Sequence, residues 1–476
     1  MAKLPELPKP RPRPPVVDIA PGAPQLFVDD YLIDRSENLV RRLGDMRKYE
    51  GNPVLSPGRP WEGGTAFPFG GGVYRIGGEW RMWYNTYRRW LKGRERTSLC
   101  YATSHDGIDW QKPSLSLHEV AGTRKNNVVL SLEMDNCSVI YDPEDPDADR
   151  RFKAVAYTKG DEGTGLYGFT SEDGVHWRPS PRILIPKAGD RTSFWYDALR
   201  KRYVVFTRYG PVLPGRYIFR AESEDFLNWT TPELVLHWSE IDLAHGRQHY
   251  GANGFVYGDM YLGFLEVFHY PYRRLDTELI CSRDGRAWER VCEGEVFLPN
   301  GPDRSFDQFW AFPAASPPIR VGDELWIYYA GRMHPHSPPG PPAHGREPDG
   351  TPKATFWAAT GLVRMRVDGF ASLDASGEEG VLVTVPVRFV EGRELRVNAD
   401  VDRPPPGSSW LKVGFLDEEG RPIAGFSPEG ADTIKGDSVA HRASWGGRWE
   451  ISPLSGRPVR LAFRFVNTRL YSFTVR

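Results

Sequence analysis

The sequence predicts an all-β protein, with a five-bladed β-propeller followed by a C-terminal β-sandwich. Three observations support this fold class. The 476 residues include 49 Gly, 42 Pro and 13% aromatic residues, which is typical of many short strands joined by tight turns. A Ser-x-Asp-x-x-x-Trp motif occurs four times, and an aromatic strand-like run precedes each copy. From about residue 381 this pattern gives way to separate alternating segments, which are typical of a sandwich.

The four copies of the motif set the period of the repeat. They begin at Ser104, Ser171, Ser223 and Ser282, which are 67, 52 and 59 residues apart. A propeller blade fits four strands into about 40–60 residues, so this spacing predicts one motif per blade. The motif Asp can bond the backbone two residues on, and the Gly that follows it in three copies accepts a positive φ. We therefore expect the repeated Ser, Asp and Trp to build turns and to pack between sheets.

Five strand-like runs define the expected blades. They are 80–84, 152–157, 203–206, 261–265 and 325–329. The fifth run lacks a full motif, and 355–367 leads instead to a degenerate copy at Asp368. The segment 26–33 is also typical of a strand, and we expect it to close the ring by pairing with the last blade, which would protect a sheet edge. The Pro-, Gly- and His-rich insertion 334–352 is expected to form a loop over one face.

The expected domains are a Pro-rich N-terminal arm at 1–25, the propeller at 26–376 as the catalytic domain, and the sandwich at 377–476. The strands expected in the sandwich are 381–387, 393–401, 410–416 and 459–466. A sugar platform could be built from the tryptophans of this domain, but most tryptophans are largely buried, so core packing is the expected role. These tryptophans are Trp410, Trp445 and Trp449.

Composition excludes several classes of partner. The net charge is −1, so no global field attracts nucleic acid, and no apolar stretch of membrane-spanning length occurs. The N-terminus lacks the apolar core of a secretory signal, which predicts a cytoplasmic protein as the sequence is written, or a secreted or periplasmic one if a leader was removed. The four Cys lack metal-type spacing and are expected to be reduced, mostly buried thiols. No cofactor is expected, although a structural axial cation such as calcium is the alternative, and nothing indicates an oligomeric state.

The motifs with their upstream aromatic strands resemble the five-bladed propeller glycoside hydrolases, the superfamily of invertases and arabinanases. The trailing sandwich is similar to the invertase branch. The segments 26–33, 52–55, 425–427, 436–438 and 470–473 resemble an uncharacterised bacterial group near that superfamily. The resemblance implies a carbohydrate-active propeller. The sequence departs from the superfamily in lacking an Asn-Asp-Pro-Asn segment, an Arg-Asp-Pro and a Glu-Cys, so the three catalytic acids cannot be carried over by motif.

Strand ends predict where a site would lie. In a propeller, the inner strand of each blade begins at the face where the second strand ends, so residues at these positions should converge on one funnel. The candidate catalytic acids at these positions are Asp135, Asp190, Glu62 and Asp307. The candidate substrate-binding residues are Trp61, Tyr87, Lys159, Arg191, Arg208, His249, Tyr250, His269, Trp310 and Arg332. No residue is assigned to a metal.

The leading functional hypothesis is a glycoside hydrolase that uses paired carboxylates in the funnel. Glycosidases need one carboxyl group as the acid and a second as base or nucleophile, so two acids within about 10 Å would favour it. The arginines suggest a uronate, sialic or sulfated glycan, unless they pair with the nearby acids instead. The alternatives are a polysaccharide lyase in which His249 or Tyr250 acts with arginine neutralisation, and a non-catalytic carbohydrate-binding propeller. Each of the three predicts a carbohydrate partner.

Overall fold

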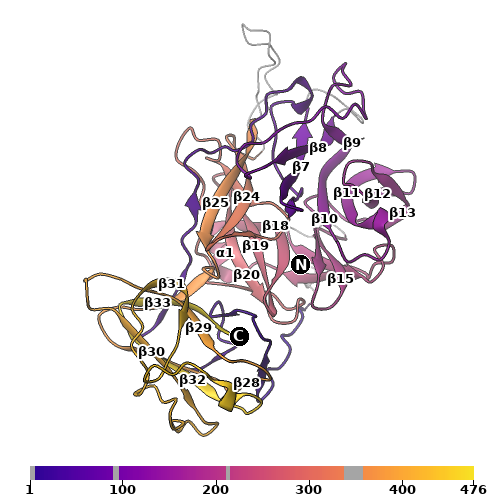
Figure 1. Ribbon diagram of the computed structural model, residues 1–476. Helices are drawn as coiled ribbons and strands as arrows, with labels where there is room; N and C mark the ends of the chain where they lie inside the picture. The colour runs from indigo at the N-terminus through magenta and orange to yellow at the C-terminus, as the bar shows by residue number, and fades with distance from the viewer. Residues whose placement is uncertain (1–5, 89–95, 211–214, 337–356) are drawn as a thin grey trace.

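The computed structural model describes residues 6–88, 96–210, 215–336 and 357–476 (Figure 1). Nearly all regular structure is strand, which confirms the predicted all-β class. The helices are the six-residue α1 (Glu240–His245) and single turns such as η1 (Pro60–Glu62), η3 (Ala148–Arg150) and η4 (Ser452–Leu454). None of the helices in the described ranges is long and apolar enough to cross a membrane.

Strands between residues 73 and 290 form four successive antiparallel sheets, which we call sheets I to IV. Sheet I contains β6 (Val73–Ile76), β7 (Glu79–Tyr87), β8 (Thr97–Ser104) and β9 (Val128–Leu132). Sheet II contains β10 (Met134–Tyr141), β11 (Phe152–Gly160), β12 (Gly163–Ser171) and β13 (Arg178–Pro186). Sheet III contains β14 (Ser193–Asp197), β15 (Arg202–Thr207), β16 (Ile218–Ser223) and β17 (Glu233–Leu236). Sheet IV contains β18 (Arg247–Tyr257), β19 (Met260–His269), β20 (Arg274–Ser282) and β21 (Glu289–Arg290).

Sheet V differs from the others because its last strand comes from the N-terminus. It contains β22 (Trp310–Pro313), β23 (Ile319–Val321), β24 (Glu324–Arg332), β25 (Ala358–Arg366) and β5 (Arg47–Lys48). The five predicted strand runs lie in β7, β11, β15, β19 and β24, the strand that pairs with the first strand of each sheet. One parallel pair, Leu275 with Trp310, joins sheets IV and V.

Hydrogen bonds link the five sheets in a closed series. Each link joins strands of neighbouring sheets near their first strands, and the last link returns from sheet V to the segment before β6. The links are Cys137 N–H to Asn85 Oδ1 (3.1 Å), Phe194 N–H to Ser138 Oγ (3.1 Å), Ser193 Oγ–H to Ala252 O (2.6 Å), Asn253 Nδ2–H to Ala314 O (2.7 Å) and Ala315 N–H to Gly71 O (3.2 Å). Each satisfies a polar group that would be costly to bury unpaired.

The repeated motif builds turns, as its sequence predicts. In the first copy Ser104 Oγ donates to Asp106 Oδ1 (2.9 Å), and that carboxylate accepts from the N–H groups of Ile108 and Asp109 (2.8 and 2.9 Å). The other three copies repeat these bonds. In the copy that lacks Gly, Phe226 takes a left-handed φ of 71° and is fully buried.

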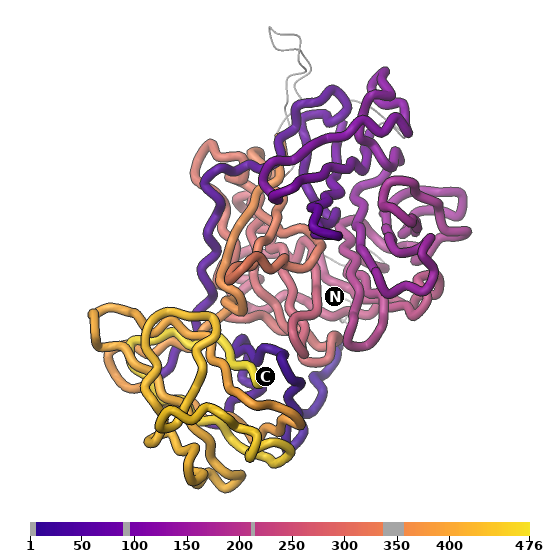
Figure 2. The backbone as a smooth tube through the Cα atoms, in the orientation of Figure 1, coloured from indigo at the N-terminus to yellow at the C-terminus, as the bar shows by residue number. Residues whose placement is uncertain are grey.

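The C-terminal strands form two further sheets, and the N-terminal strands β1 to β4 pair with them (Figure 2). One sheet contains β31 (Gly436–Arg442), β29 (Leu395–Val401), β33 (Thr468–Val475), β26 (Ala371–Ala375), β4 (Val40–Leu43) and β2 (Gln25–Leu26). The other contains β3 (Ile33–Glu37), β27 (Gly380–Thr384), β32 (Arg460–Val466) and β30 (Trp410–Leu416), and β1 (Val17–Ile19) pairs with β28 (Val387–Phe389). Strands between residues 17 and 43 therefore pair with strands after residue 370, and only the partner of β4, β26, precedes the predicted boundary at 377. Trp445 is buried in this core, as expected, whereas Trp449 is 38% exposed.

The prediction that 26–33 forms the closing strand is wrong. Leu26 and Val28 pack in the core of sheets IV and V, whereas Phe27 and Leu32 pack in the C-terminal core. The segment is apolar on both faces because it contacts two cores, and it turns at Asp29, whose carboxylate accepts from Tyr31 N–H (3.2 Å). The strand that pairs with β25 is β5.

We expect Phe27→Ala to lower the free energy of unfolding by about 3–5 kcal/mol, because it removes a fully buried ring from the C-terminal core. The Phe27 ring contacts the rings of Phe463 and Phe473, with centroids 6.0 Å away in each case. Urea unfolding measures the change. Val40→Ala, on the nearby β4 with 55% exposure, is the control and should change stability by less than about 0.5 kcal/mol.

Candidate active site

The candidate site lies where the first strands of sheets II to V begin. Asp135 is in β10, Asp190 precedes β14, Tyr250 is in β18, and Trp310 begins β22. Tyr87, at the end of β7, interacts electrostatically with Asp135, Asp190 and Tyr250. We call these five residues and Arg208 the central cluster. The structure therefore brings together six of the residues predicted from strand ends.

Asp135 lies at an irregularity in the strand and has no ionic or hydrogen-bond partner among the described residues. The register of β10 shifts between Met134 and Cys137, and such bulges re-aim side chains beside active sites. Burial, and then the nearby charge of Asp190, raise the pKa of Asp135 to about 6, although Arg208 and Arg191 oppose the shift. Asp135 can therefore hold a proton close to neutral pH.

Asp190 has the opposite environment, because it forms an ion pair with Arg208. The Arg208 guanidinium also donates to the backbone oxygen of Tyr250 (2.8 Å) and lies over the Tyr250 ring, 4.6 Å from its centroid. These contacts fix the position of Arg208 between sheets III and IV. The cluster thus contains one carboxyl group whose pKa is raised by burial beside one that is held in an ion pair.

Arg191 and Glu266 form a buried ion pair beneath the central cluster. Arg191 has a left-handed φ of 58°, and its guanidinium lies between the rings of Phe69 and Phe312, 4.1 and 4.4 Å from their centroids. Its Nε donates to Glu266 Oε2 (2.5 Å), and the indole N–H of Trp310 donates to the other oxygen. Burial raises the pKa of Glu266, and Arg191 opposes this. The ion pair therefore holds Trp310 in the cluster.

Tyr250 shares a hydrogen bond with His336 (2.8 Å). Burial raises the pKa of Tyr250 to about 12, while Arg208 opposes the shift. Burial and the nearby Arg332, Arg216 and Arg208 lower the pKa of His336 to about 4, so its imidazole is neutral at pH 7. The Arg216 guanidinium covers the other side of this group, 5.1 Å from the Tyr250 centroid.

Sequence reasoning missed Glu266, Arg216 and His336. Glu266 was detectable as the single acid in the apolar strand β19, but only the strand ends were considered. Arg216 lies just before β16, the third strand of sheet III, and only first and second strands were expected to reach the site; His336 falls in the insertion that was predicted only as a loop. Most of that insertion, 337–352, lies outside the described residues.

Two predicted acids lie in separate networks away from the central cluster. Glu62 is fully buried, accepts from Tyr84 Oη–H (2.8 Å) and from the N–H groups of the two residues before η1 (2.7 and 2.8 Å), and pairs with Lys112 (2.5 Å). Asp307 pairs with Lys48 (2.5 Å) and accepts from Tyr329 Oη–H (2.8 Å), so it attaches β5 to sheet V. These contacts support structural roles for both acids.

The remaining predicted binding residues are distributed around the cluster. His249 is fully buried against Asp242 (3.1 Å), and His269 pairs with Asp276 (2.9 Å). Trp61 donates from its indole N–H to Asn127 Oδ1 (2.7 Å). Arg332 lies over the Trp310 ring, 5.1 Å from its centroid, and Lys159 is exposed at the end of β11.

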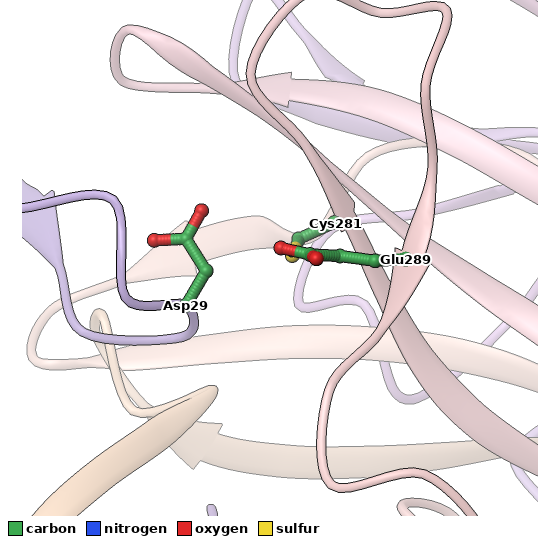
Figure 3. Close-up of side chains that lie close together, drawn as sticks. All are labelled: Asp29, Cys281 and Glu289. Atoms are coloured by element: carbon green, nitrogen blue, oxygen red, sulfur yellow. The ribbon is translucent and has the colours of Figure 1, made fainter. Parts of the chain in front are cut away.

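Within the described ranges, one group of side chains has ligand atoms close enough for a metal ion, and it lies outside the central cluster (Figure 3). It contains Asp29, Cys281 and Glu289. Both oxygens of Asp29 already accept from the Arg283 guanidinium, at 2.7 and 2.8 Å. Burial and Asp29 also raise the pKa of the Cys281 thiol well above its usual range, so the thiolate that a metal needs is disfavoured. The group therefore fits a salt-bridged contact better than a metal centre.

No family model and no curated protein matches the chain. Solved structures do: a β-1,2-mannobiose phosphorylase from Listeria innocua is 15% identical and has a TM-score of 0.46, over 68% of this chain and 97% of that one. An N-acetylgalactosamine deacetylase from F. plautii is 16% identical, with a TM-score of 0.45 over 70% and 97%. A thermostable family-43 glycoside hydrolase is 13% identical, with a TM-score of 0.42 over 68% and 89%. Similarity at this level does not identify a reaction, so the function is argued from the side chains.

We expect Gly251→Ala to displace Arg191 from Glu266. An added Cβ would lie 2.5 Å from Arg191 Cγ and 2.9 Å from Glu266 Oε2, so the buried pair must separate. Breaking such a pair costs about 3–5 kcal/mol, which urea unfolding would measure. Gly58→Ala, where the added Cβ has no neighbour within 4 Å, should be close to wild type. Equal stability of both variants would contradict the expectation that a Cβ at position 251 separates Arg191 from Glu266.

Asp135→Asn should stabilise the folded protein at pH 8 and have little effect near pH 4. The folded pKa of about 6 lies above the unfolded value near 3.9, so wild-type stability falls as pH rises between these values. The variant avoids that loss, by up to about 3 kcal/mol. Thermal melting across pH measures it.

Asp173→Asn is a control in which the change in stability at pH 8 should have the opposite sign. Burial opposes the shift, but hydrogen bonds from the His176 backbone and ring lower the pKa of Asp173 to about 2. Removing this charge should therefore destabilise the protein at pH 8. A loss of stability at pH 8 in both variants would contradict the assignment of a raised pKa to Asp135.

Proposed function

We propose that the protein is a carbohydrate-active enzyme that hydrolyses a glycosidic bond in an acidic glycan. The observation that carries the proposal is the pair formed by Asp135 and Asp190. Burial and the charge of Asp190 raise the pKa of Asp135 to about 6, whereas Asp190 is paired with Arg208. A carboxyl group with a raised pKa near one that is held in an ion pair matches the acid and base that glycoside hydrolysis needs.

In this proposal Asp135 protonates the glycosidic oxygen as the bond to the sugar breaks. Asp190 then activates a water molecule or attacks the sugar carbon, and its contact with Arg208 orients it. The buried pair of Arg191 and Glu266 does not touch the sugar but holds Trp310 in the wall of the site. Trp310 and Tyr250 supply aromatic surface against which a sugar can pack.

The preference for an acidic glycan rests on Arg216. Two predicted cations, Arg191 and Arg208, are paired with Glu266 and Asp190, as the alternative reading of the arginines expects. Arg216 instead bonds the Gln248 side chain, and no described carboxylate lies within ion-pair distance of it. Burial, and then the charge of Arg208, lower the pKa of Arg216, so an anion nearby would stabilise its charge. A carboxylate or sulfate of the substrate fits that position.

The domain arrangement is part of the same proposal. Sheets I to V would be the five blades of one propeller, and the two sheets that contain β26 to β33 would be a sandwich packed against it. The closed series of hydrogen bonds supports the first statement, and the single core between the C-terminal sheets supports the second. The central cluster would then lie at one end of the propeller axis.

A polysaccharide lyase is the second candidate, and the pair of Tyr250 with His336 favours it. The neutral imidazole could act as a base, and Arg208 and Arg216 could neutralise a uronate. In this candidate function, His336 has the role of base that the sequence suggested for His249. The pKa of about 12 for Tyr250 weighs against it, because little tyrosinate forms at pH 7.

We expect wild-type protein to release reducing ends from at least one of polygalacturonate, alginate and chondroitin sulfate. The absorbance at about 235 nm, which a lyase product would raise, should not increase. Asp135→Asn should lower kcat/KM by about 10²–10⁴, the usual contribution of a positioned acid. Wild-type kcat/KM should fall as pH rises through about 6, because the protonated form of Asp135 is lost. Asp106→Asn, in a motif turn, is the control.

Three outcomes would redirect the assignment. Absorbance growth that survives Asp135→Asn and disappears in Tyr250→Phe would identify the lyase. Activity on yeast mannan alone would keep the hydrolase and remove the acidic substrate. Binding of a glycan without turnover would leave a carbohydrate-binding propeller.

A further inference from the structure

The turn between β19 and β20 places two tyrosine side chains in solvent at the same end of sheet IV as the central cluster. Tyr270 and Tyr272 are 65% and 71% exposed, and within the described chain no other tyrosine is so exposed. The turn follows His269, which pairs with Arg247 at the start of β18, three residues before Tyr250. Exposed aromatic surface of this kind beside a site is typical of a binding surface.

Backbone hydrogen bonds hold this turn in one conformation. Tyr270 N–H donates to Gly246 O (3.0 Å), and Tyr272 N–H donates to His269 O (3.1 Å). His336 N–H donates to the oxygen of Arg273 (3.0 Å), so the turn is joined to the residue that bonds Tyr250. The two rings are therefore presented by a fixed backbone, and little conformational entropy is lost when a ligand packs on them.

Aromatic contacts connect the turn to the central cluster without a break. The ring centroids of Trp310 and Tyr250 are 5.6 Å apart, those of Tyr250 and Phe268 are 5.9 Å apart, and those of Phe268 and Tyr270 are 6.0 Å apart. All three pairs meet edge to face. The series runs from buried Trp310 to exposed Tyr270, so the same aromatic surface extends from the site to its edge.

We infer that Tyr270 and Tyr272 form an outer sugar subsite, which binds units of the glycan chain beyond those at the central cluster. The inference rests on the proposed function, because it requires a glycan in the central cluster. Tyrosine suits this role, since its rigid ring offers apolar surface at low entropic cost and its hydroxyl can bond a sugar. The turn also carries Arg273 and no acid, and Arg274 begins β20, so this end of the sheet does not repel an acidic chain.

The test compares short and long substrates. Oligogalacturonates of two and of six units are the probes, with size-graded alginate and chondroitin sulfate oligosaccharides if one of those polymers is the one cleaved. Tyr270→Ala/Tyr272→Ala should lower kcat/KM on the hexamer by about tenfold or more and leave the dimer within about twofold. Tyr270→Phe/Tyr272→Phe keeps the rings and should restore most of the loss. Leu199→Ala is the control, because Leu199 is an exposed apolar side chain between β14 and β15, outside the turn and the central cluster.

Binding in the Asp135→Asn background separates this inference from the proposed reaction. If the tyrosine pair lowers hexamer affinity in that background while wild type cleaves nothing, the subsite is supported and the hydrolase is not. If wild type cleaves and the tyrosine pair changes nothing at either length, the subsite is overturned and the hydrolase stands. An equal loss on both lengths also overturns it, because the turn would then shape the central cluster itself. Absence of all glycan binding would overturn both.

Discussion

The fold depends on one short segment that belongs to two cores at once. Leu26 and Val28 are buried among sheets IV and V, and Phe27, between them, is buried in the C-terminal core. The carboxylate of the next residue, Asp29, accepts hydrogen bonds from two nitrogens of the Arg283 guanidinium. The segment is therefore also joined to sheet IV by a charge-assisted contact. Alternate side chains of an extended segment point in opposite directions, and here each direction is apolar. The C-terminal sheets cannot separate from sheets IV and V without exposing the Phe27 ring or the Leu26 and Val28 side chains to water.

In and beside the central cluster, almost every buried charge is paired with a group of opposite charge. Arg191 is paired with Glu266, and Arg208 with Asp190, as burial of ions requires. Asp135 is the exception among the described carboxyl groups of the cluster, because it has no ion-pair partner and burial raises its pKa to about 6. Burying an unpaired carboxyl group lowers the free energy of unfolding, a cost that proteins commonly accept at functional sites. Arg191, whose charge acts on Asp135, has a left-handed φ that the surrounding structure must hold.

Sequence patterns predicted the strands and the motif turns because both are local. The Ser-x-Asp-x-x-x-Trp bonds join residues two or three apart, and each aromatic run fills one strand. Pairing of the chain ends is not local, so nothing near Val17 or Leu26 indicated that β1 to β4 pair with strands after residue 370. In the site, strand-end reasoning found Asp135, Asp190 and Tyr250. It could not find Glu266, which reaches the cluster from mid-strand, or separate Glu62 and Asp307, whose partners lie in other loops.

The interlocking of the chain ends has a consequence for the order of folding. Strands β1 to β5 are synthesised early, but their partners β25 to β28 and β33 lie beyond residue 357. While the chain emerges from the ribosome, sheets I to IV can assemble from neighbouring hairpins, since their pairs are sequential. Phe27 stays uncovered until the C-terminal sheets form, because its core consists of their side chains. Joining of β5 to sheet V and packing of the C-terminal sheets are therefore late, long-range steps, and until then the chain is open to misassembly.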